Sequence, residues 1–252
     1  MIEVACVCVG KKYDPALYVD QLYKGVLANV SEPFNFVVIT DTPEHPYYNT
    51  IPCRTVQAPN WGNLQGPREA WWYKMFMFSP EAGFTDKVFY CDLDVIIQGS
   101  LDKFLDYGGN RFAICQDFNR KWVRNYRVSN SSIMRWHAPD YYNIWKEFND
   151  DKDAFIKKFL GDQDFMTHYF AEREELKVWW PERWAMSFKW ELYRGGLVKS
   201  GTGLDENNNW PASPSMYAVP EQPWVIPDEC SIVVFHGDPK PWDTELGKQR
   251  IR

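Results

Sequence analysis

The stretch from residue 88 to residue 97 reads V-F-Y-C-D-L-D-V-I-I, an apolar run that Asp92 and Asp94 interrupt. Its β-branched and aromatic residues predict a buried strand, where an unpaired carboxylate is costly. Ligands of open α/β sheets bind outside the carboxyl ends of the strands, so acids at such an end are placed to face a site. The stretch therefore predicts a central strand over Val88–Cys91 that delivers two carboxylates to a ligand site.

The sequence before this strand alternates strand and helix patterns. Apolar residues between Pro15 and Val30 recur with helical spacing, and this segment lies between two β-type runs. A helix that connects two strands in this way forms a βαβ unit. The expected elements are strands Ile2–Val9, Phe36–Thr40 and Ile51–Val56, helix Pro15–Val30, and helix Arg68–Phe78 ended by Pro80. The fold class is therefore α/β, a Rossmann-like domain with a mostly parallel central sheet flanked by helices.

The later part of the chain has a less regular pattern. The expected elements are strands Phe112–Gln116, Ser131–Arg135 and Ile232–Phe235 and helices Pro139–Phe148 and Gln163–Glu172. Residues 195–227 are rich in Gly, Asn, Ser and Pro, and a loop of this length in a compact domain usually has a function. We expect one domain over residues 1–252, with a flexible flap at 195–227 and a closing carboxyl-terminal segment.

Composition limits the partners that the chain can have. The 252 residues carry a formal net charge of −6, so no global positive field can bind a phosphate backbone, and nucleic acid is not an expected partner. No apolar run approaches the roughly 20 residues of a transmembrane segment. The six cysteines contain no C-x-x-C pair and mostly lie in apolar runs, which favours a reducing, cytoplasmic setting.

Asp92 and Asp94 have the chemistry of a metal site. Two nearby carboxylates raise each other's pKa unless a cation lies between them, and a divalent ion that prefers oxygen ligands satisfies both. On this basis, removal of one carboxylate should relieve repulsion in the metal-free protein. The alternative is a turn in which an aspartate caps the backbone, because D-x-D strings are common.

A second polar cluster follows the last expected strand, where residues 236–242 read H-G-D-P-K-P-W. Neutral imidazole is a good ligand for Mn²⁺ or Zn²⁺, and Gly237 permits close approach of the backbone to a ligand. Lys240, between two prolines, offers a point charge for phosphate. Together these residues suit a metal-bound diphosphate. The alternative is that His236 is satisfied in a turn and Lys240 is solvated.

Three separated segments of the chain match the motifs of one protein family. They are residues 87–101, K-V-F-Y-C-D-L-D-V-I-I-Q-G-S-L, residues 161–166, G-D-Q-D-F-M, and residues 237–242, G-D-P-K-P-W. In their order and spacing they resemble the GT-A fold glycosyltransferases, and most closely the family 8 group of glycogenin-like and lipooligosaccharide galactosyltransferase-like enzymes. The resemblance implies one GT-A domain, with a nucleotide-sugar-binding half over residues 1–98 and an acceptor-side half over residues 99–252.

The resemblance also implies a donor and a cofactor. It places a UDP-sugar in the site, with Mn²⁺ or Mg²⁺ on Asp92 and Asp94, and with Asp92 also contacting the donor. It implies that Lys240 contacts the diphosphate. Lys74 falls where the family has a basic residue that contacts the donor, although a solvated helix lysine is the alternative.

Further site residues follow from the same resemblance. Asp162, Gln163 and Asp164 fall where family members contact the donor sugar and the reaction centre, and we expect them to be catalytic. A Gly-Asp pair before a helix is also an ordinary N-cap. The remaining expected donor contacts are Val9, Tyr13, Asn130 and Gly237.

The chain departs from the family pattern at the metal histidine. Family members have this histidine three residues before the glycine, where this chain has Val234, whereas His236 directly precedes Gly237. Positions 234 and 236 of a strand point to the same side, so we expect His236 to reach the same cavity. At the amino end, residues 8–13 should run under the nucleotide base, but the acidic base contact of the family is absent.

The expected function is metal-dependent transfer of a hexose or similar sugar from a UDP-sugar to an acceptor hydroxyl, with retention of configuration as in family 8. An inverting enzyme would need a carboxylate base, for which Asp162 or Asp164 could serve. The alternative class is a protein that binds carbohydrate or nucleotide without turnover. A sugar nucleotidyltransferase is disfavoured because its G-x-G-T-R loop is missing after the first strand. A glycan, a protein side chain and a modified nucleobase all stay open as acceptor.

Overall fold

The structure is a computed structural model of the chain, and it describes residues 1–62, 64, 66, 69–118, 127–192, 225–237 and 239–250. The strands are β1 (Ile2–Cys8), β2 (Phe34–Thr40), β3 (Cys53–Gln57), β4 (Lys87–Cys91), β5 (Val95–Ile97), β6 (Phe112–Gln116), β7 (Ser129–His137), β8 (Lys177–Trp179), β9 (Ala185–Ser187) and β10 (Ile232–Val234). Within these residues, one sheet has 7 strands in the order β3-β2-β1-β4-β7-β6-β8, and a second has 3 strands in the order β5-β10-β9.

The large sheet is mostly parallel. β1 pairs in parallel with β2 and β4, β2 pairs in parallel with β3, and β6 pairs in parallel with β8. Among its described strands, β7 alone runs the other way, antiparallel to both β4 and β6. The predicted α/β class with a mostly parallel central sheet is therefore confirmed.

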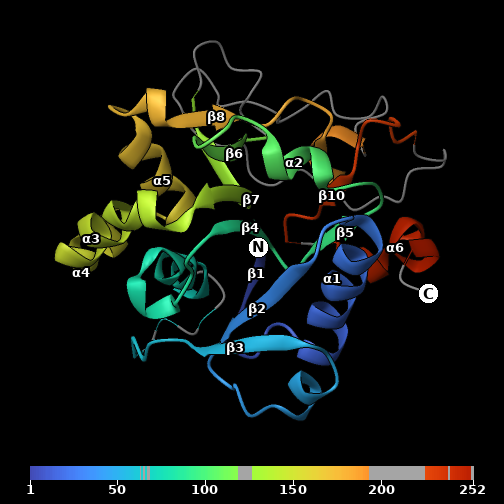
Figure 1. The fold of residues 1–252 in the computed structure, drawn as a ribbon, viewed down its shortest axis with the longest axis horizontal. Helices are drawn as coiled ribbons and strands as arrows, with labels where there is room; N and C mark the ends of the chain where they lie inside the picture. The colour runs from blue at the N-terminus through green and yellow to red at the C-terminus, as the bar shows by residue number, and fades with distance from the viewer. Residues whose placement is uncertain are drawn as a thin grey trace.

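Helices lie on both sides of the large sheet (Figure 1). They are α1 (Pro15–Asn29), α2 (Asp102–Asp106), α3 (Tyr142–Asp150), α4 (Lys152–Lys158), α5 (Asp162–Phe170) and α6 (Glu245–Arg250). In Figure 1, α1 and α6 lie on one side of the sheet, and α3, α4 and α5 lie on the other. The central strands consequently have two buried faces, which explains why their sequences are continuous apolar runs instead of alternating ones.

Strand β2 shows how the core is divided between these faces. Val37 and Ile39 pack in a cluster with residues that precede β4 and residues of α3 and α5, whereas Phe36 and Val38 pack with Leu22 of α1. Alternate residues of a strand point to opposite faces, so each strand contributes to both clusters. The predicted βαβ unit is present, and α1 begins at Pro15 after Asp14, whose side chain accepts a hydrogen bond from the backbone N–H of Ala16.

The segment before β4 differs from the prediction of an α-helix over Arg68–Phe78. Arg68 lies outside the described residues, and Glu69–Phe78 (η2) consists of successive 3₁₀ turns. All residues from Trp72 to Phe78 are buried. A segment buried on every side has no exposed helical face, and its aromatic residues lose side-chain freedom in an α-helix. The α-helix prediction was wrong here.

The run from residue 88 to residue 97 is two strands in two different sheets. β4 belongs to the large sheet and β5 to the small one, with Asp92 and Asp94 at the junction between them. The sequence pattern did not predict β5, β8 or β9 as separate strands. The expected helix over Pro139–Phe148 is a 3₁₀ turn followed by α3, and α5 begins one residue before the predicted start.

Most of the expected flap lies outside the described residues. Residues 195–224 belong to this part of the chain, so the flap stays a prediction. All six cysteines carry free thiols. Across the described part of the chain, every helix is too short or too polar to cross a bilayer.

Candidate functional site

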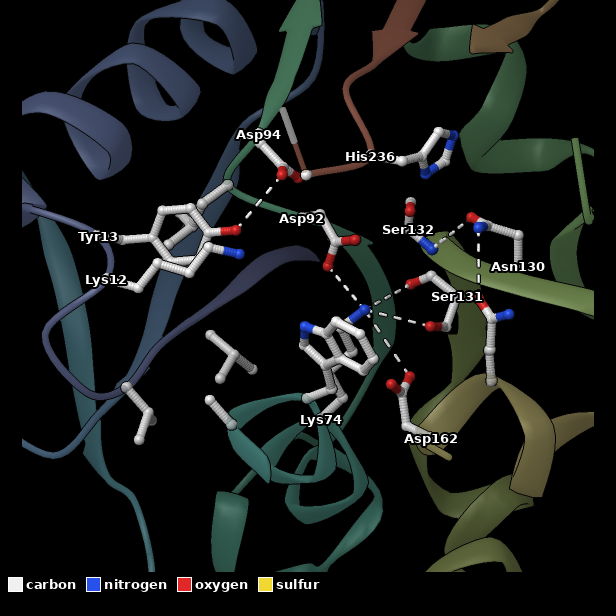
Figure 2. Close-up of a pocket in the computed structure, with 18 of the residues that line it drawn as sticks. Lys12, Tyr13, Lys74, Asp92, Asp94, Asn130, Ser131, Ser132, Asp162 and His236 are labelled. Atoms are coloured by element: carbon white, nitrogen blue, oxygen red, sulfur yellow. Dashed lines mark hydrogen bonds and ion pairs between the residues drawn. The ribbon is translucent and has the colours of Figure 1, made fainter. Parts of the chain in front are cut away.

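A cavity of about 750 Å³ opens where β1 and β4 end and the junction to β5 begins (Figure 2). The expected site residues that line it are Val9, Tyr13, Lys74, Asp92, Asp94, Asn130, Asp162, Gln163, Asp164, His236 and Gly237. Lys240 contacts Asp94. The structure thus brings together all the site residues expected from the sequence, from both halves of the chain.

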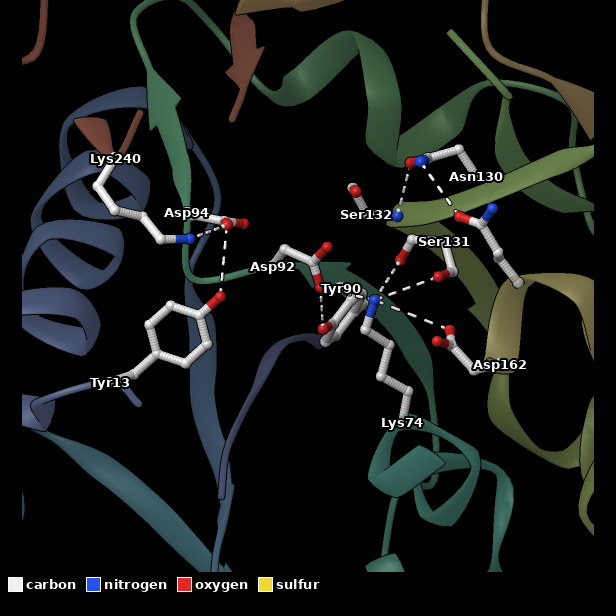
Figure 3. Close-up of polar contacts among 11 residues, drawn as sticks. Tyr13, Lys74, Tyr90, Asp92, Asp94, Asn130, Ser131, Ser132, Asp162 and Lys240 are labelled. Atoms are coloured by element: carbon white, nitrogen blue, oxygen red, sulfur yellow. Dashed lines mark hydrogen bonds and ion pairs between the residues drawn. The ribbon is translucent and has the colours of Figure 1, made fainter. Parts of the chain in front are cut away.

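Lys74 is the centre of a buried charge cluster (Figure 3). Its Nζ lies 2.8 Å from Oδ1 of Asp92 and 3.7 Å from Oδ2 of Asp162, and it donates to Oγ of Ser131 at 3.1 Å. The hydroxyl of Tyr90 donates to the same Asp92 oxygen at 2.5 Å. Only 8% of Lys74 is exposed, so it is not the solvated helix lysine of the alternative interpretation.

Lys240 makes the corresponding contact with Asp94 (Figure 3). Its Nζ lies 2.8 Å from Oδ2 of Asp94, and the hydroxyl of Tyr13 donates to the same oxygen at 3.3 Å. The ammonium group also lies 5.2 Å from the centre of the Tyr13 ring. Each aspartate of the D-x-D pair therefore has its own buried lysine and its own tyrosine hydroxyl.

The two aspartates differ in their electrostatic balance. Burial disfavours the charge of Asp92, but Lys74 and the Tyr90 hydroxyl outweigh it and hold the pKa of Asp92 below its ordinary value. For Asp94, burial together with the charge of Asp92 outweighs Lys240 and raises its pKa. Burial also raises the pKa of Asp162, in spite of Lys74. The cavity therefore holds three acids in unequal environments.

His236 lies just beyond the end of β10. The N–H of Phe235 donates to the carbonyl of Asp94 at 2.9 Å, which extends the β5–β10 pairing to the edge of the cavity. Val234 is fully buried in the core and does not line the cavity. Position 236 follows β10 instead of belonging to it. The alternation of side chains along a strand therefore does not relate the direction of His236 to that of Val234.

The imidazole of His236 is neutral and has an unused ring nitrogen. Burial, with the positive charges of Lys189, Lys74 and Lys240, lowers the pKa of His236 to about 3. Its ring lies 5.1 Å from that of Phe118, and its buried Nε2 has no hydrogen-bond partner among the described residues. A buried nitrogen without a partner is costly unless a ligand supplies one.

The donor set fits a divalent metal in its chemistry. Asp92 and Asp94 supply carboxylate oxygens and His236 supplies a neutral nitrogen, a mixture that Mn²⁺ accepts. In the present arrangement each carboxylate contacts a lysine, and within the described residues no three Asp, Glu, His or Cys side chains are close enough together to hold an ion. The metal therefore stays a prediction, supported by the unpartnered Nε2 of His236.

A chain of amides lines the cavity on the side of β7 and α5. Nδ2 of Asn130 donates to Oε1 of Gln163 at 3.4 Å, and Nε2 of Gln163 donates to Oδ2 of Asp117 at 3.4 Å. Oδ1 of Asn130 accepts from the N–H of Ser132 at 3.0 Å (Figure 2). These contacts engage both ends of each amide, so each has its second N–H and the remaining lone pair of its oxygen for a ligand.

Several supporting residues were not expected from the sequence. Tyr90 holds Asp92, and Asp117 holds Gln163. Asp41 accepts from the N–H of Gly10 through both carboxylate oxygens, at 3.2 Å each, and so fixes the start of the loop after β1. Asp41 directly follows β2, so the rule that singled out Asp92 would have found it.

Comparison with solved structures places the fold among the GT-A glycosyltransferases. The galactosyltransferase LgtC, solved in complex with donor and acceptor sugar analogs, has a TM-score of 0.64 at 14% identity, over 99% of this chain and 93% of LgtC. An active-site mutant of LgtC gives 0.62 at 14% identity, over the same shares of the two chains. The glycosyltransferase GlyE of Streptococcus pneumoniae TIGR4 gives 0.61 at 13% identity, over 99% of this chain and 60% of GlyE. No protein-family model matches the sequence, and no curated protein matches it.

Proposed function

We propose that the protein is a glycosyltransferase that moves a hexose or similar sugar from a UDP-sugar to an acceptor hydroxyl. The observation that carries this proposal is the cavity beyond β1 and β4, where a pair of acids, a neutral imidazole and two buried lysines meet. Two cations and a D-x-D pair at the carboxyl ends of strands are the groups that a nucleoside diphosphate requires. The fold shared with LgtC and GlyE supports the same class of reaction.

The diphosphate end of the donor is assigned to the Asp94 side of the cavity. Lys240 already lies at Asp94, so its ammonium group is available to phosphate oxygens bound there. Gly237 has a positive φ of 77° and no side chain, which lets the backbone approach a ligand closely. Mn²⁺ or Mg²⁺ held by Asp92, Asp94 and His236 would neutralise the charge that develops on the departing diphosphate.

The sugar is assigned to the opposite wall. Asn130 and Gln163 are held by neighbouring groups, and the second N–H and the remaining oxygen lone pair of each amide are the groups we assign to sugar hydroxyls. We assign Asp162, which contacts Lys74, to the reaction centre. The bond from the anomeric carbon to the diphosphate oxygen breaks while the bond to the acceptor oxygen forms, and the proton of the acceptor hydroxyl passes to the departing diphosphate. We propose retention, which follows from the family 8 motifs at residues 161–166 and 237–242.

The test is release of UDP from UDP-glucose and UDP-galactose in the presence of Mn²⁺. We expect slow release without an acceptor, loss of release when a chelator is added, and a decrease of at least about tenfold in Gln163→Ala. Gln57→Ala, on an exposed position of β3 outside the cavity, serves as the matched control and should match the wild type. If neither UDP-glucose nor UDP-galactose is turned over, the proposed glycosyl transfer from these UDP-sugars is rejected.

A binding protein without turnover is the second candidate. The observation that favours it is that Lys74 and Lys240 form direct ion pairs with Asp92 and Asp94, the two expected metal ligands. Such a protein would bind UDP with equal affinity whether or not Mn²⁺ is present, and it would release no UDP from a UDP-sugar. Calorimetric titration with UDP, with and without Mn²⁺, distinguishes the two candidates.

A further inference from the structure

Trp71 is exposed in a segment that otherwise packs into the core. In η2 all residues from Trp72 to Phe78 are buried, whereas Trp71 is 42% exposed and lines the cavity. It is the only exposed tryptophan among those that the structure describes, and no other described ring stacks on it. An exposed indole at the wall of a polar cavity offers an apolar surface that the free protein does not use.

Gly161 explains how the indole keeps this position. A Cβ atom at residue 161 would lie 3.1 Å from Cε3 of Trp71, a tighter contact than side chains normally make. The backbone of Gly161 is extended, with φ of −175° and ψ of −178°, so its conformation does not demand glycine. The missing side chain therefore serves the close approach of Trp71 to the start of α5.

The surroundings of the indole combine apolar and polar groups. Leu160, which is 71% exposed, lines the cavity beside it, and Asp164 accepts a hydrogen bond from the N–H of Leu160 at 3.3 Å. Lys74, one turn further along η2, contacts Asp162. The platform, defined as Trp71 and Leu160, thus adjoins the carboxylates that begin α5.

We propose that this platform binds the acceptor, and that the acceptor is a pyranoside with an apolar C–H face. The C–H face of a pyranose ring packs on an indole, while its hydroxyl groups need acceptors such as the carboxylate of Asp164. This placement sets the acceptor next to Asp162, because Trp71 contacts the preceding residue, Gly161. The inference rests on the proposed glycosyl transfer and adds the acceptor class and its binding residue.

The experiment uses methyl β-D-galactopyranoside and methyl β-D-glucopyranoside as probes. We measure UDP release from a UDP-sugar with Mn²⁺ as each glycoside is added, in the wild type, Trp71→Ala, Trp71→Phe and Leu27→Ala. Leu27, which is 56% exposed on α1 and outside the cavity, provides the control. We expect Trp71→Ala to raise the KM of the effective glycoside by roughly fivefold to tenfold, with kcat less affected, and Trp71→Phe to restore part of the loss.

A second measurement reports on stacking without turnover. Saturation-transfer NMR with UDP and Mg²⁺ should show the strongest transfer at the ring C–H protons of the bound glycoside, and Trp71→Ala should abolish that pattern while its affinity for UDP stays within twofold. Equal KM values in Trp71→Ala and the wild type, or a wild type that releases UDP but neither binds nor responds to either glycoside, would overturn the platform and leave the transferase intact. If no UDP-sugar is turned over, the proposed glycosyl transfer is rejected. The saturation-transfer NMR with each glycoside then tests the platform independently of turnover.

Discussion

Lys74 lies between two buried acids, and its position determines what its removal would do. It contacts Asp92 at 2.8 Å and Asp162 at 3.7 Å, with 11% of its side chain exposed. Breaking a buried ion pair leaves the partner charge uncompensated in a poorly solvated place, which costs about 3–5 kcal/mol. Lys74 is therefore expected to stabilise the fold as well as to bind the donor.

Replacement of Lys74 by methionine should lower the free energy of unfolding by about 3–5 kcal/mol. Lys87→Met is the matched control, because Lys87 pairs with Asp106 at the same 2.8 Å but with side chains that are 33% and 82% exposed. An exposed pair contributes about 0–1 kcal/mol. Urea denaturation of both variants checks the difference, and equal losses would contradict the buried cluster.

Asp94 and Lys240 should be energetically coupled. We expect Lys240→Met to destabilise the metal-free protein, because it leaves the buried charge of Asp94 without its partner. Asp94→Asn should cost less, because burial and the charge of Asp92 already disfavour the ionised form of Asp94 and raise its pKa. The double variant should be more stable than the sum of the single losses predicts, with a coupling free energy above about 1 kcal/mol. A double-mutant cycle from thermal unfolding measures it. Simple additivity of the two single losses would show that the lysine contact is unimportant.

This coupling also shows where reasoning from the D-x-D pair alone was incomplete. Two acids near each other in a sequence predict repulsion, and from this we expected that removing one would relieve strain. The structure gives each acid a lysine from a distant part of the chain. The positions of Asp92 and Asp94 at a strand end could be predicted from local pattern, but their partners could not, because such contacts depend on the tertiary arrangement.

At the scale of elements, the turn between α2 and β6 fixes the edge of the large sheet. Gly108 and Gly109 both have positive φ, 76° and 63°. A Cβ atom at Gly108 would lie 2.6 Å from Cγ1 of Val178 in β8, whereas one at Gly109 would meet nothing within 4 Å. The two glycines therefore share a backbone requirement but differ in packing.

Substitution by alanine separates these two effects. Gly109→Ala should cost about 1 kcal/mol for the left-handed backbone alone. Gly108→Ala should cost roughly 1–3 kcal/mol more, because the added methyl group overpacks the contact with β8. Urea denaturation of both variants provides the measurement, and a Gly108→Ala variant as stable as Gly109→Ala would disprove the close packing of β8 on this turn.

The elements that the sequence predicted well are those with a strong local signal. β1, α1 and β2 have long apolar runs or a clear helical period, and α1 has a capping aspartate and a first-turn proline. β5, β8 and β9 are only three residues each and exist through pairing with partners far along the chain. Runs this short carry no reliable periodicity. The 3₁₀ turns of η2 were missed for a related reason, since their burial is set by the elements around them.

At the scale of the whole molecule, the cavity joins the two halves of the chain. Residues 1–98 supply Tyr13, Lys74 and the two aspartates, and residues 99–252 supply the amides, His236 and Lys240. The strands of both halves also belong to one sheet, because β4 pairs with β7. A ligand in this cavity therefore contacts groups whose relative position depends on the complete sheet.

We accordingly expect the protein to unfold in one cooperative transition. UDP with Mn²⁺ should raise the midpoint temperature of that whole transition. A ligand present at about 100 times its Kd stabilises the folded state by about 2.7 kcal/mol, which for a domain of this size raises Tm by roughly 5–10 °C. Differential scanning calorimetry should show a single endotherm that moves by this amount with UDP and Mn²⁺ and does not move with the same concentration of AMP. Asp94→Asn should reduce the shift because it removes one of the groups that we propose for binding of the diphosphate. Two endotherms, of which only one responds to UDP, would instead mean that the halves fold separately and that the ligand contacts only one of them.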